Sequence, residues 1–343
     1  MGGSRVNILA IIPARSGSKS VPHKNIRLID GKPMLAYSIE HALQSKLINR
    51  VIVSTDSEEY AKIAKEYGAE VPFIRPKEYA TDTSLDIDVF YHCLDYLRKK
   101  ENYEADIVVQ LRPTYPIRNP EDIDQMIMML QENEKADSVR SMALATEIPY
   151  KMWKKGTDGT ILPIATDIPE CYNMPRQELP TAYYQNACID VVRARVILEE
   201  HSMSGNTILG YEMKDNYDID TEEEMTHAGN KLKISKGGKR FVFDIDGVIA
   251  RLEPSNNYHL SEPNTPMIDV VNKLYEMGNE IILFTARGYV TGKDWSTVTR
   301  EQLAKWGVKY HELHFGKPNA DYYVDDKFID MNVLMEMFLD TSK

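Results

Sequence analysis

The sequence contains few cysteines and no long apolar run. Cys93, Cys171 and Cys188 are the only thiols among 343 residues, and their spacing matches neither a metal-binding motif nor a disulfide framework. No apolar stretch is long enough to cross a bilayer, and there is no signal-peptide pattern. We therefore expect a cytoplasmic protein, with Cys93 and Cys188 in its core because both lie in apolar runs.

The sequence also lacks an excess of basic residues. Its 41 Lys and Arg against 52 Asp and Glu give a formal net charge of −11, which argues against binding to nucleic acid or to a membrane surface. The hydrophobic fraction of 43% is sufficient for a packed core, and a length of 343 residues predicts two domains.

One loop near the N-terminus is basic despite this overall charge. It lies between an apolar strand expected at 6–12 and an amphipathic helix expected at 34–47, and it carries Arg15, Lys19 and Lys24 among small residues. Small residues let the backbone approach a ligand, and cations at the carboxyl end of a strand suit a triphosphate. The Walker pattern is missing, which argues against a P-loop ATPase. The remaining alternative is a basic surface loop.

Six short motifs follow one another along the first two thirds of the chain. They are 13–25 (PARSGSKSVPHKN), 51–56 (VIVSTD), 75–76 with 80–83 (RP and ATDT), 111–118 (LRPTYPIR), 175–177 with Asn186 (PRQ and N), and 218–221 (DIDT). In this order they resemble the signature segments of the CMP-sialic acid synthetase (acylneuraminate cytidylyltransferase) family. The resemblance covers about residues 5–230.

This resemblance implies a Rossmann-like nucleotidyltransferase that transfers CMP from CTP to an acidic sugar and releases pyrophosphate. It implies that Arg15 and Lys24 are catalytic and neutralise the phosphates. It also implies that the nucleotide is bound by Ala14, Arg15, Ser18, Lys24, Asn25, Arg75 and Asp82.

Two carboxylates match the metal-binding run of the family. Asp218 and Asp220 are two residues apart on an extended segment, so both can face one side and offer hard oxygen ligands to Mg²⁺. The alternative is a helix cap by Asp220 or Thr221, because three glutamates follow and a helix is expected at 221–232.

The acceptor site departs from the family pattern. Arg112 stands where the family carries Gln, and residues 183–187 read YYQNA where it reads FRPNG. We expect a cationic pocket for an acid, because Arg binds carboxylate, phosphate or phosphonate in a bidentate manner. A nonulosonic acid, a ketodeoxy sugar acid and a phosphonate are all candidates. The resemblance assigns substrate binding to Arg112, Lys151, Arg176, Gln185 and Asn186.

The C-terminal part carries four further motifs, each of which places reactive side chains at the end of an apolar run. They are Asp244 and Asp246 in 241–248, Thr285 in 281–287, Lys317 in 315–318, and Asp325 and Asp326 in 323–326. In this order they resemble motifs I to IV of the haloacid dehalogenase (HAD) superfamily. The gaps between them leave no room for a cap domain.

The HAD resemblance implies a Mg²⁺-dependent phosphatase that removes the phosphate from a small phosphorylated precursor before CMP is attached. In this interpretation Asp244 is the nucleophile, Asp246 is the acid and base, and Thr285 and Lys317 hold the phosphoryl oxygens. Mg²⁺ would be bound by Asp244, Asp246, Asp325 and Asp326. The alternative is a domain retained only for oligomerisation.

The alternation of strand and helix patterns predicts an α/β protein of two domains, each a mostly parallel sheet flanked by helices. We expect the first domain at 1–234, a linker at 235–239 and the second domain at 240–343. Strands of the first domain are expected at 6–12, 50–54, 106–111, 137–142, 188–193 and 207–212, and its helices at 34–47, 57–67, 86–100, 120–133 and 221–232.

Residues 145–185 form an irregular stretch rich in Pro, Tyr and polar residues. The cytidylyltransferase resemblance implies an arm that dimerises and covers the substrate, and the alternative is a solvated surface loop. We therefore expect a homodimer or a homotetramer.

Overall fold

The computed structural model divides the chain into two compact units, with the division between Ala228 and Gly229. It describes residues 6–18, 21–213, 218–253, 255, 257–289, 291–320, 322–323, 325 and 327–339. Within these residues no helix has the length and apolar character needed to span a bilayer. The three cysteines are free thiols, and all are buried, as expected for Cys93 and Cys188.

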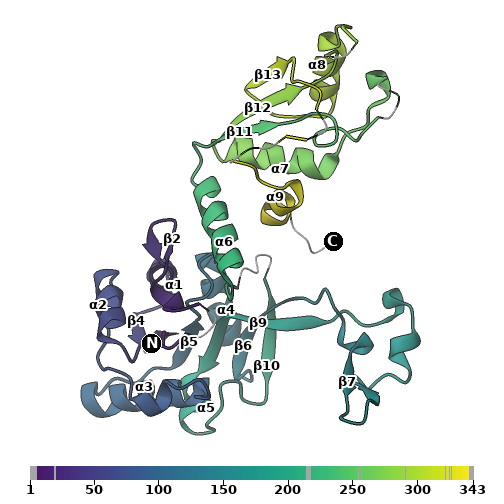
Figure 1. Cartoon of the computed structure of the whole chain (residues 1–343). Coiled ribbons are helices and arrows are strands. Elements are labelled where there is room, and N and C mark those ends of the chain that lie inside the picture. The colour runs from purple at the N-terminus through teal and green to yellow at the C-terminus, as the bar shows by residue number, and fades with distance from the viewer. Residues whose placement is uncertain are drawn as a thin grey trace. The chain divides into compact units, whose positions relative to one another are not determined.

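The first unit is built on a six-stranded sheet in the order β10-β6-β9-β5-β1-β4 (Figure 1). Neighbours β1 and β4, β1 and β5, and β10 and β6 are parallel, whereas β9 runs antiparallel to both β5 and β6. The expected mostly parallel α/β sheet is therefore confirmed. The strands are β1 (Ile8–Pro13), β4 (Arg50–Ser54), β5 (Ile107–Leu111), β6 (Ser138–Leu144), β9 (Tyr183–Arg193) and β10 (Ile208–Glu212).

Helices cover both faces of this sheet, which explains why β1 reads as an unbroken apolar run. Ile8, Ala10 and Ile12 pack on one face, while Leu9 and Ile11 pack on the other. The first face is covered by α1 (Met34–Gln44), α2 (Glu58–Glu66) and α4 (Pro120–Glu132), and the second by α3 (Asp86–Glu101) and α5 (Ala194–Leu198). Strands β2 (Leu28–Ile29) and β3 (Lys32–Pro33) form a short hairpin before α1.

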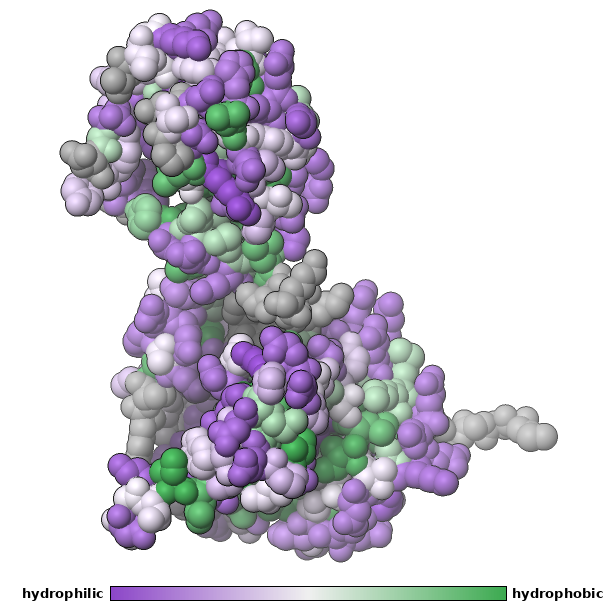
Figure 2. All heavy atoms as spheres, turned by 90° about the vertical axis from the view of Figure 1, so that its right-hand side faces the viewer, coloured by the Kyte–Doolittle hydropathy of each residue, from purple (hydrophilic) through white to green (hydrophobic). Residues whose placement is uncertain are grey.

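Residues 145–185 were expected to be irregular, but they contain a hairpin of β7 (Trp153–Lys155) and β8 (Ile161–Pro163). The arm projects from the sheet beside β9 (Figure 1). It has its own small core around Ile148, Cys171 and Leu179. Figure 2 shows hydrophobic side chains among polar ones on this side of the first unit. The arm exposes Met152, Trp153, Ile161, Leu162 and Ile164.

The second unit has a three-stranded parallel sheet in the order β11-β12-β13. One side chain cluster, which includes Ile245, Val271, Leu283 and Leu334, forms its core. The strands are β11 (Arg240–Phe243), β12 (Glu280–Thr285) and β13 (Glu312–Phe315), and the helices are α7 (Thr265–Glu276), α8 (Ser296–Lys305) and α9 (Met331–Phe338).

The chain enters the second unit within α6 (Glu222–Ser235), before the linker expected at 235–239. Ile234 belongs to the core of the second unit, and its carbonyl accepts a hydrogen bond from the Asn279 amide at 3.3 Å. The Gly238 N–H donates to the Gly278 carbonyl at 3.0 Å. The glycines of the expected linker are therefore packed against the turn between α7 and β12.

We predict that Gly237→Ala destabilises the second unit more than Gly238→Ala. Both glycines have positive φ, 72° and 70°, so either alanine should cost about 1 kcal/mol. A Cβ at Gly237 would lie 2.3 Å from the Met277 carbonyl oxygen, whereas one at Gly238 meets nothing within 4 Å. The clash should add about 1–3 kcal/mol. Denaturant unfolding followed by tryptophan fluorescence measures both, and equal losses would contradict the clash.

Candidate functional site

The first candidate site lies where β1, β4 and β5 end side by side. The loop after β1 is fixed to the end of β4, because the Ala14 N–H donates to the Ser54 carbonyl at 2.9 Å. Ser16 donates to both oxygens of Asp56, from its N–H at 2.8 Å and from its hydroxyl at 2.9 Å. The carboxyl ends of adjacent parallel strands are the usual place for ligands in open α/β sheets.

Arg75, which sequence assigned to the nucleotide, is 4% exposed and bonded to the end of β4. Its Nε donates to the Ser54 hydroxyl at 3.1 Å, its Nη2 to the Ser54 carbonyl, and its Nη1 to the Tyr79 carbonyl at 3.3 Å. Burial lowers the pKa of Arg75 to about 10, and the nearby Asp56 and Asp86 act against this shift. The guanidinium therefore holds the end of β4 and the Tyr79 backbone in place beside the site.

Arg15 and Asn25 lie together in the basic loop, as the sequence suggested. The Asn25 amide donates to the Arg15 carbonyl at 3.0 Å, and Arg15 Nη1 lies 2.5 Å from Asp82 Oδ1. The side chains of Arg15 and Asp82 are 35% and 39% exposed, so this pair is accessible to a ligand. The Ser18 N–H donates to the Ser16 carbonyl at 3.1 Å.

Lys24 joins this loop to the acidic run almost two hundred residues later. Its Nζ donates to the Ile219 carbonyl and to Asp220 Oδ1, both at 2.9 Å. The lysine side chain is 10% exposed and that of Asp220 is 69% exposed. The structure therefore brings the expected phosphate-binding cation and one of the expected metal ligands into direct contact.

The helix cap that competed with a metal role is provided by Thr221 and Glu224. The Thr221 hydroxyl accepts from the Glu224 N–H at 3.2 Å, and Glu224 Oε2 accepts from the Thr221 N–H at 2.8 Å. This is a capping box at the start of α6. It leaves the Asp220 carboxylate for Lys24.

Asp218 lies beside Asp220, and its carboxyl group is near the hydroxyls of Thr114 and Tyr115. Although the residue as a whole is exposed, burial of its carboxyl group raises the pKa of Asp218, and the charge of Asp220 adds to this. Two carboxylates that repel each other fit a divalent cation. Within the described ranges, no three His, Cys, Asp or Glu side chains form a metal-binding group.

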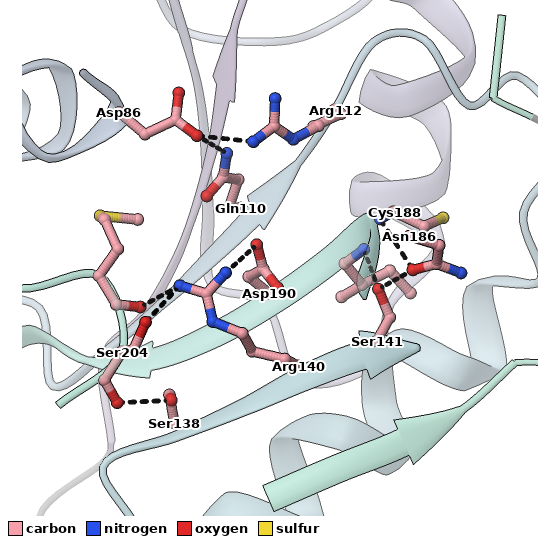
Figure 3. Close-up of polar contacts among 12 residues, drawn as sticks. Asp86, Gln110, Arg112, Ser138, Arg140, Ser141, Asn186, Cys188, Asp190 and Ser204 are labelled. Atoms are coloured by element: carbon pink, nitrogen blue, oxygen red, sulfur yellow. Dashed lines mark hydrogen bonds and ion pairs between the residues drawn. The ribbon is translucent and has the colours of Figure 1, made fainter. Parts of the chain in front are cut away.

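Arg112 emerges at the end of β5 and is partly exposed. Its Nη2 lies 2.7 Å from Asp86 Oδ2, which also accepts from the Gln110 amide at 3.0 Å (Figure 3). Arg118, also in this segment, is 5% exposed, and its guanidinium donates hydrogen bonds to other groups of the protein. Its partners are the Cys188 thiol and carbonyl, the Ser38 hydroxyl, the His41 ring and the Arg112 carbonyl.

Within the described chain, the other residues assigned to the acceptor form no side-chain bond with Arg112. Asn186 is 4% exposed, and its side-chain oxygen accepts from the Ser141 hydroxyl at 2.6 Å and from the Cys188 N–H at 3.2 Å (Figure 3). Gln185 precedes it on β9 and pairs with Met142 on β6. The next residue, Ala187, has a φ of 56° in a bulge of β9, at the position where the resembling family carries Gly.

Lys151 and Arg176 hold the arm together. Lys151 Nζ donates to the Met174 carbonyl at 2.8 Å, and Arg176 Nη2 donates to the Thr146 carbonyl at 2.6 Å. Within the described chain, neither side chain bonds to Arg112 or to Asn186.

Comparison with known proteins places the chain in a family. A model described as Cytidylyltransferase matches residues 9–154. The CMP-N,N'-diacetyllegionaminic acid synthase of Legionella pneumophila is 35% identical over 221 residues, which are 63% of this chain and 92% of that relative. The chain belongs to the cytidylyltransferase family.

Two further similarities agree with this assignment. The N-acylneuraminate cytidylyltransferase of Escherichia coli is 33% identical over 221 residues, which are 64% of this chain and 50% of that relative. The structure of CMP:2-keto-3-deoxy-manno-octonic acid synthetase complexed with CTP has a TM-score of 0.50 at 19% identity, and the match covers 66% of this chain and 98% of that one. The first unit of the cytidylyltransferase therefore has the nucleotidyltransferase fold expected from its sequence.

The second unit of this cytidylyltransferase has a separate cluster at the ends of β11, β12 and β13. Lys317 Nζ forms an ion pair with Asp244 Oδ2. The Lys317 N–H donates to the Thr285 carbonyl at 3.1 Å, and Thr285 is fully buried. Residues from three of the four expected HAD motifs are thus neighbours.

Asp246 is bound by Arg287, which the sequence suggested could either touch the substrate or only position the loops. Arg287 Nε and Nη2 donate to the carboxylate at 2.9 and 2.7 Å. Its Nη1 donates to the Thr299 hydroxyl at 3.2 Å and to Gln302 Oε1 at 2.8 Å, and the Tyr258 ring centroid lies 4.6 Å from the guanidinium carbon. The Arg287 side chain has no exposed area. It lies two residues after the end of β12, and that position was the available signal.

The fourth expected motif is placed differently from the first three. Asp325 was expected to close a parallel strand, but Tyr322, Tyr323 and Asp325 are in no strand, and the third strand is β13. Asp325 Oδ1 accepts from the Lys327 N–H at 2.8 Å. Asp326 lies outside the described residues.

We predict that Arg287→Lys destabilises the second unit by about 2 kcal/mol or more, because a lysine cannot replace the planar bidentate contact with Asp246. The matched control is Arg240→Lys, since Arg240 pairs with Glu280 while its side chain is 68% exposed, and such pairs contribute little. Urea unfolding of both variants is the measurement. Equal stability would show that the buried contacts of Arg287 are dispensable.

Proposed function

We propose that the first unit transfers CMP from CTP to the hydroxyl of an acidic sugar and releases pyrophosphate. The observation that supports this most strongly is the contact between Lys24 and Asp220. It unites the basic loop after β1 with the carboxylate pair at 218 and 220, at the strand ends of a member of the cytidylyltransferase family.

In the proposed reaction the acceptor oxygen attacks the α-phosphorus of CTP, and the bond to the β-phosphate oxygen breaks. Negative charge grows on the phosphoryl oxygens, so positioning and charge stabilisation supply most of the catalysis. Arg15 and Lys24 would hold the β- and γ-phosphates, while Arg75 keeps the end of β4 in place. Asp218 and Asp220 would hold Mg²⁺, which neutralises phosphate charge when bound.

The acceptor is proposed to be a nonulosonic acid. The Legionella relative is named for N,N'-diacetyllegionaminic acid and the Escherichia coli relative for N-acylneuraminate. Arg112 directly follows β5, the strand that pairs with β1, and its side chain is partly exposed. Its guanidinium suits a carboxylate. The apolar side chains exposed on the arm fit the proposed homodimer or homotetramer.

We predict that the protein with Mg²⁺ and CTP releases pyrophosphate in the presence of N,N'-diacetyllegionaminic acid or a related nonulosonic acid. ATP, GTP and UTP should support a much lower rate with the same acid. A coupled pyrophosphate assay over acidic sugars and phosphonates is the measurement. Pyrophosphate release with a phosphonate but with no acidic sugar would show that the acceptor is a phosphonate. Equal use of all four nucleotides would reject CTP as the specific donor.

We predict that Asp220→Asn abolishes transfer without unfolding the protein, because it removes a negative charge beside Lys24 but leaves the capping box. Thr221→Ala is the matched control: it should lose about 1 kcal/mol of stability while retaining activity. Pyrophosphate release and thermal unfolding separate the two effects. Near-normal turnover by folded Asp220→Asn would remove that carboxylate from the mechanism.

For the second unit we propose a phosphatase that acts on a small phosphorylated acid. What supports it is the meeting of Asp244, Lys317 and Thr285 at three strand ends. Asp244 would attack phosphorus and Lys317 would hold phosphoryl oxygens. As the bond from phosphorus to the leaving oxygen breaks, Asp246, oriented by Arg287, would protonate that oxygen. It would then take a proton from the water that hydrolyses the phosphorylated Asp244. Asp244 and Asp325 offer the hard oxygens that suit Mg²⁺, which would screen the phosphate charge.

We predict that phosphate is released from phosphorylated sugar acids, and more slowly from aryl phosphates, in a Mg²⁺-dependent manner. Asp244→Asn should abolish this release yet leave cytidylyl transfer largely intact, since the two sites lie in separate units. Phosphate and pyrophosphate assays on the same preparation test both. No phosphate release by the unmodified protein across the panel would favour the oligomerisation module.

A further inference from the structure

The guanidinium of Arg112 is held on one side only. Asp86 is the one side chain that accepts a hydrogen bond from it within the described chain, and Arg112 Nε is buried without a partner. Arg118, six residues later, has bonds from Nε, Nη1 and Nη2 to the protein. The two arginines therefore differ: Arg118 is committed to the fold, whereas Arg112 keeps donors for a ligand.

Asp86 is itself fixed from behind the site. The Gln110 amide, on a residue that is 1% exposed, donates at 3.0 Å to the same Asp86 oxygen that Arg112 contacts (Figure 3). Asp86 also lies in the first turn of α3, where the helix dipole favours a carboxylate. A buried amide thus sets the place of Asp86, and Asp86 sets the place of Arg112.

We infer that Asp86 is a positioning residue that orients Arg112 toward the carboxylate of the acceptor acid. The inference rests on the proposed cytidylyl transfer, and it adds a residue that sequence analysis did not assign to the site. Asp86 acts through Arg112 and does not itself contact the acceptor.

Two effects of removing Asp86 oppose each other. Loss of its negative charge would raise the positive potential at Arg112 and favour binding of an acid. Loss of its hydrogen bond would free a long side chain to rotate, which weakens a directional bidentate contact. The side chains of Arg112 and Asp86 are 38% and 37% exposed, so the surrounding water weakens the charge effect. Orientation therefore dominates.

The test uses the full chain with CTP, Mg²⁺ and N,N'-diacetyllegionaminic acid, or whichever acid the pyrophosphate assay identifies. Asp86→Ala, which removes the acceptor oxygen as well as the charge, should raise the KM for the acid about tenfold while changing the KM for CTP less than about twofold. The matched control is Asp88→Ala, in the same helical turn; its carboxylate lies 3.7 Å from His201, and no ion pair joins it to Arg112 in the described residues. The control should leave both constants unchanged.

A double variant decides whether Asp86 acts through Arg112. Arg112→Gln should itself raise the KM for the acid, and adding Asp86→Ala should then change it by less than about twofold. Three results would each overturn the inference: KM effects that multiply in the double variant, an unchanged or lowered KM for the acid in Asp86→Ala alone, or an equal rise in the KM for CTP. Thermal unfolding of every variant excludes a general loss of fold. If the unmodified protein uses no acid at all, the proposed function fails, whereas normal activity with an indifferent Asp86 rejects only the positioning role.

Discussion

The alignment of β1, β4 and β5 is the constraint on which the first site depends. Pro13 pairs in register with Ser54, and Ile11 pairs with Gln110, so the three strands end at one edge of the sheet. Each is buried on both faces, so a slip of register would have to break a continuous apolar core. The loops that follow therefore start from fixed points, and their polar side chains meet without long connections.

Buried arginines stabilise the loops around both candidate sites, and their bonding separates them from the arginines that face ligands. Arg75, Arg118 and Arg287 are 5% exposed or less, and each is bonded to several protein groups. Such a guanidinium, once buried, must have its donors satisfied, because an unpaired charge in the interior is very costly. Arg15 and Arg112 have one carboxylate partner each and remain partly exposed. An arginine in a sequence motif can thus either stabilise the fold or bind a ligand, and only its surroundings decide which.

Most of the sheet could be predicted from the sequence because strands that are buried are rich in apolar residues. Largely apolar runs such as 107–111 are typical of strands buried on both faces, and the amphipathic helices between them favour a parallel order. The hairpin within the arm escaped prediction because β7 and β8 are three residues each, too short to show an alternation of apolar and polar positions. The entry into the second unit was also placed too late, since Gly237 and Gly238 read as a flexible linker although they are packed in a turn.

Within the sites, motif spacing located the reactive side chains but not their partners. Nothing in the sequence links Asp86 to Arg112, or Arg287 to Asp246, because those contacts depend on the side chains of strands and helices that come together only in the fold. Conversely, the spacing of Asp218 and Asp220 was compatible with a helix cap until Thr221 was seen to fill that role.

Both candidate sites contain a lysine paired with a carboxylate, Lys24 with Asp220 and Lys317 with Asp244. Each pair has an electrostatic consequence for the ligands proposed here. A phosphate that takes the lysine leaves the carboxylate without its cation, and a divalent cation that takes the carboxylate leaves the lysine without its anion. Either ligand alone therefore exposes an unpaired charge, whereas the two together restore the balance. Because linkage is reciprocal, the phosphate-bearing substrate and the metal should each raise the affinity for the other at both sites.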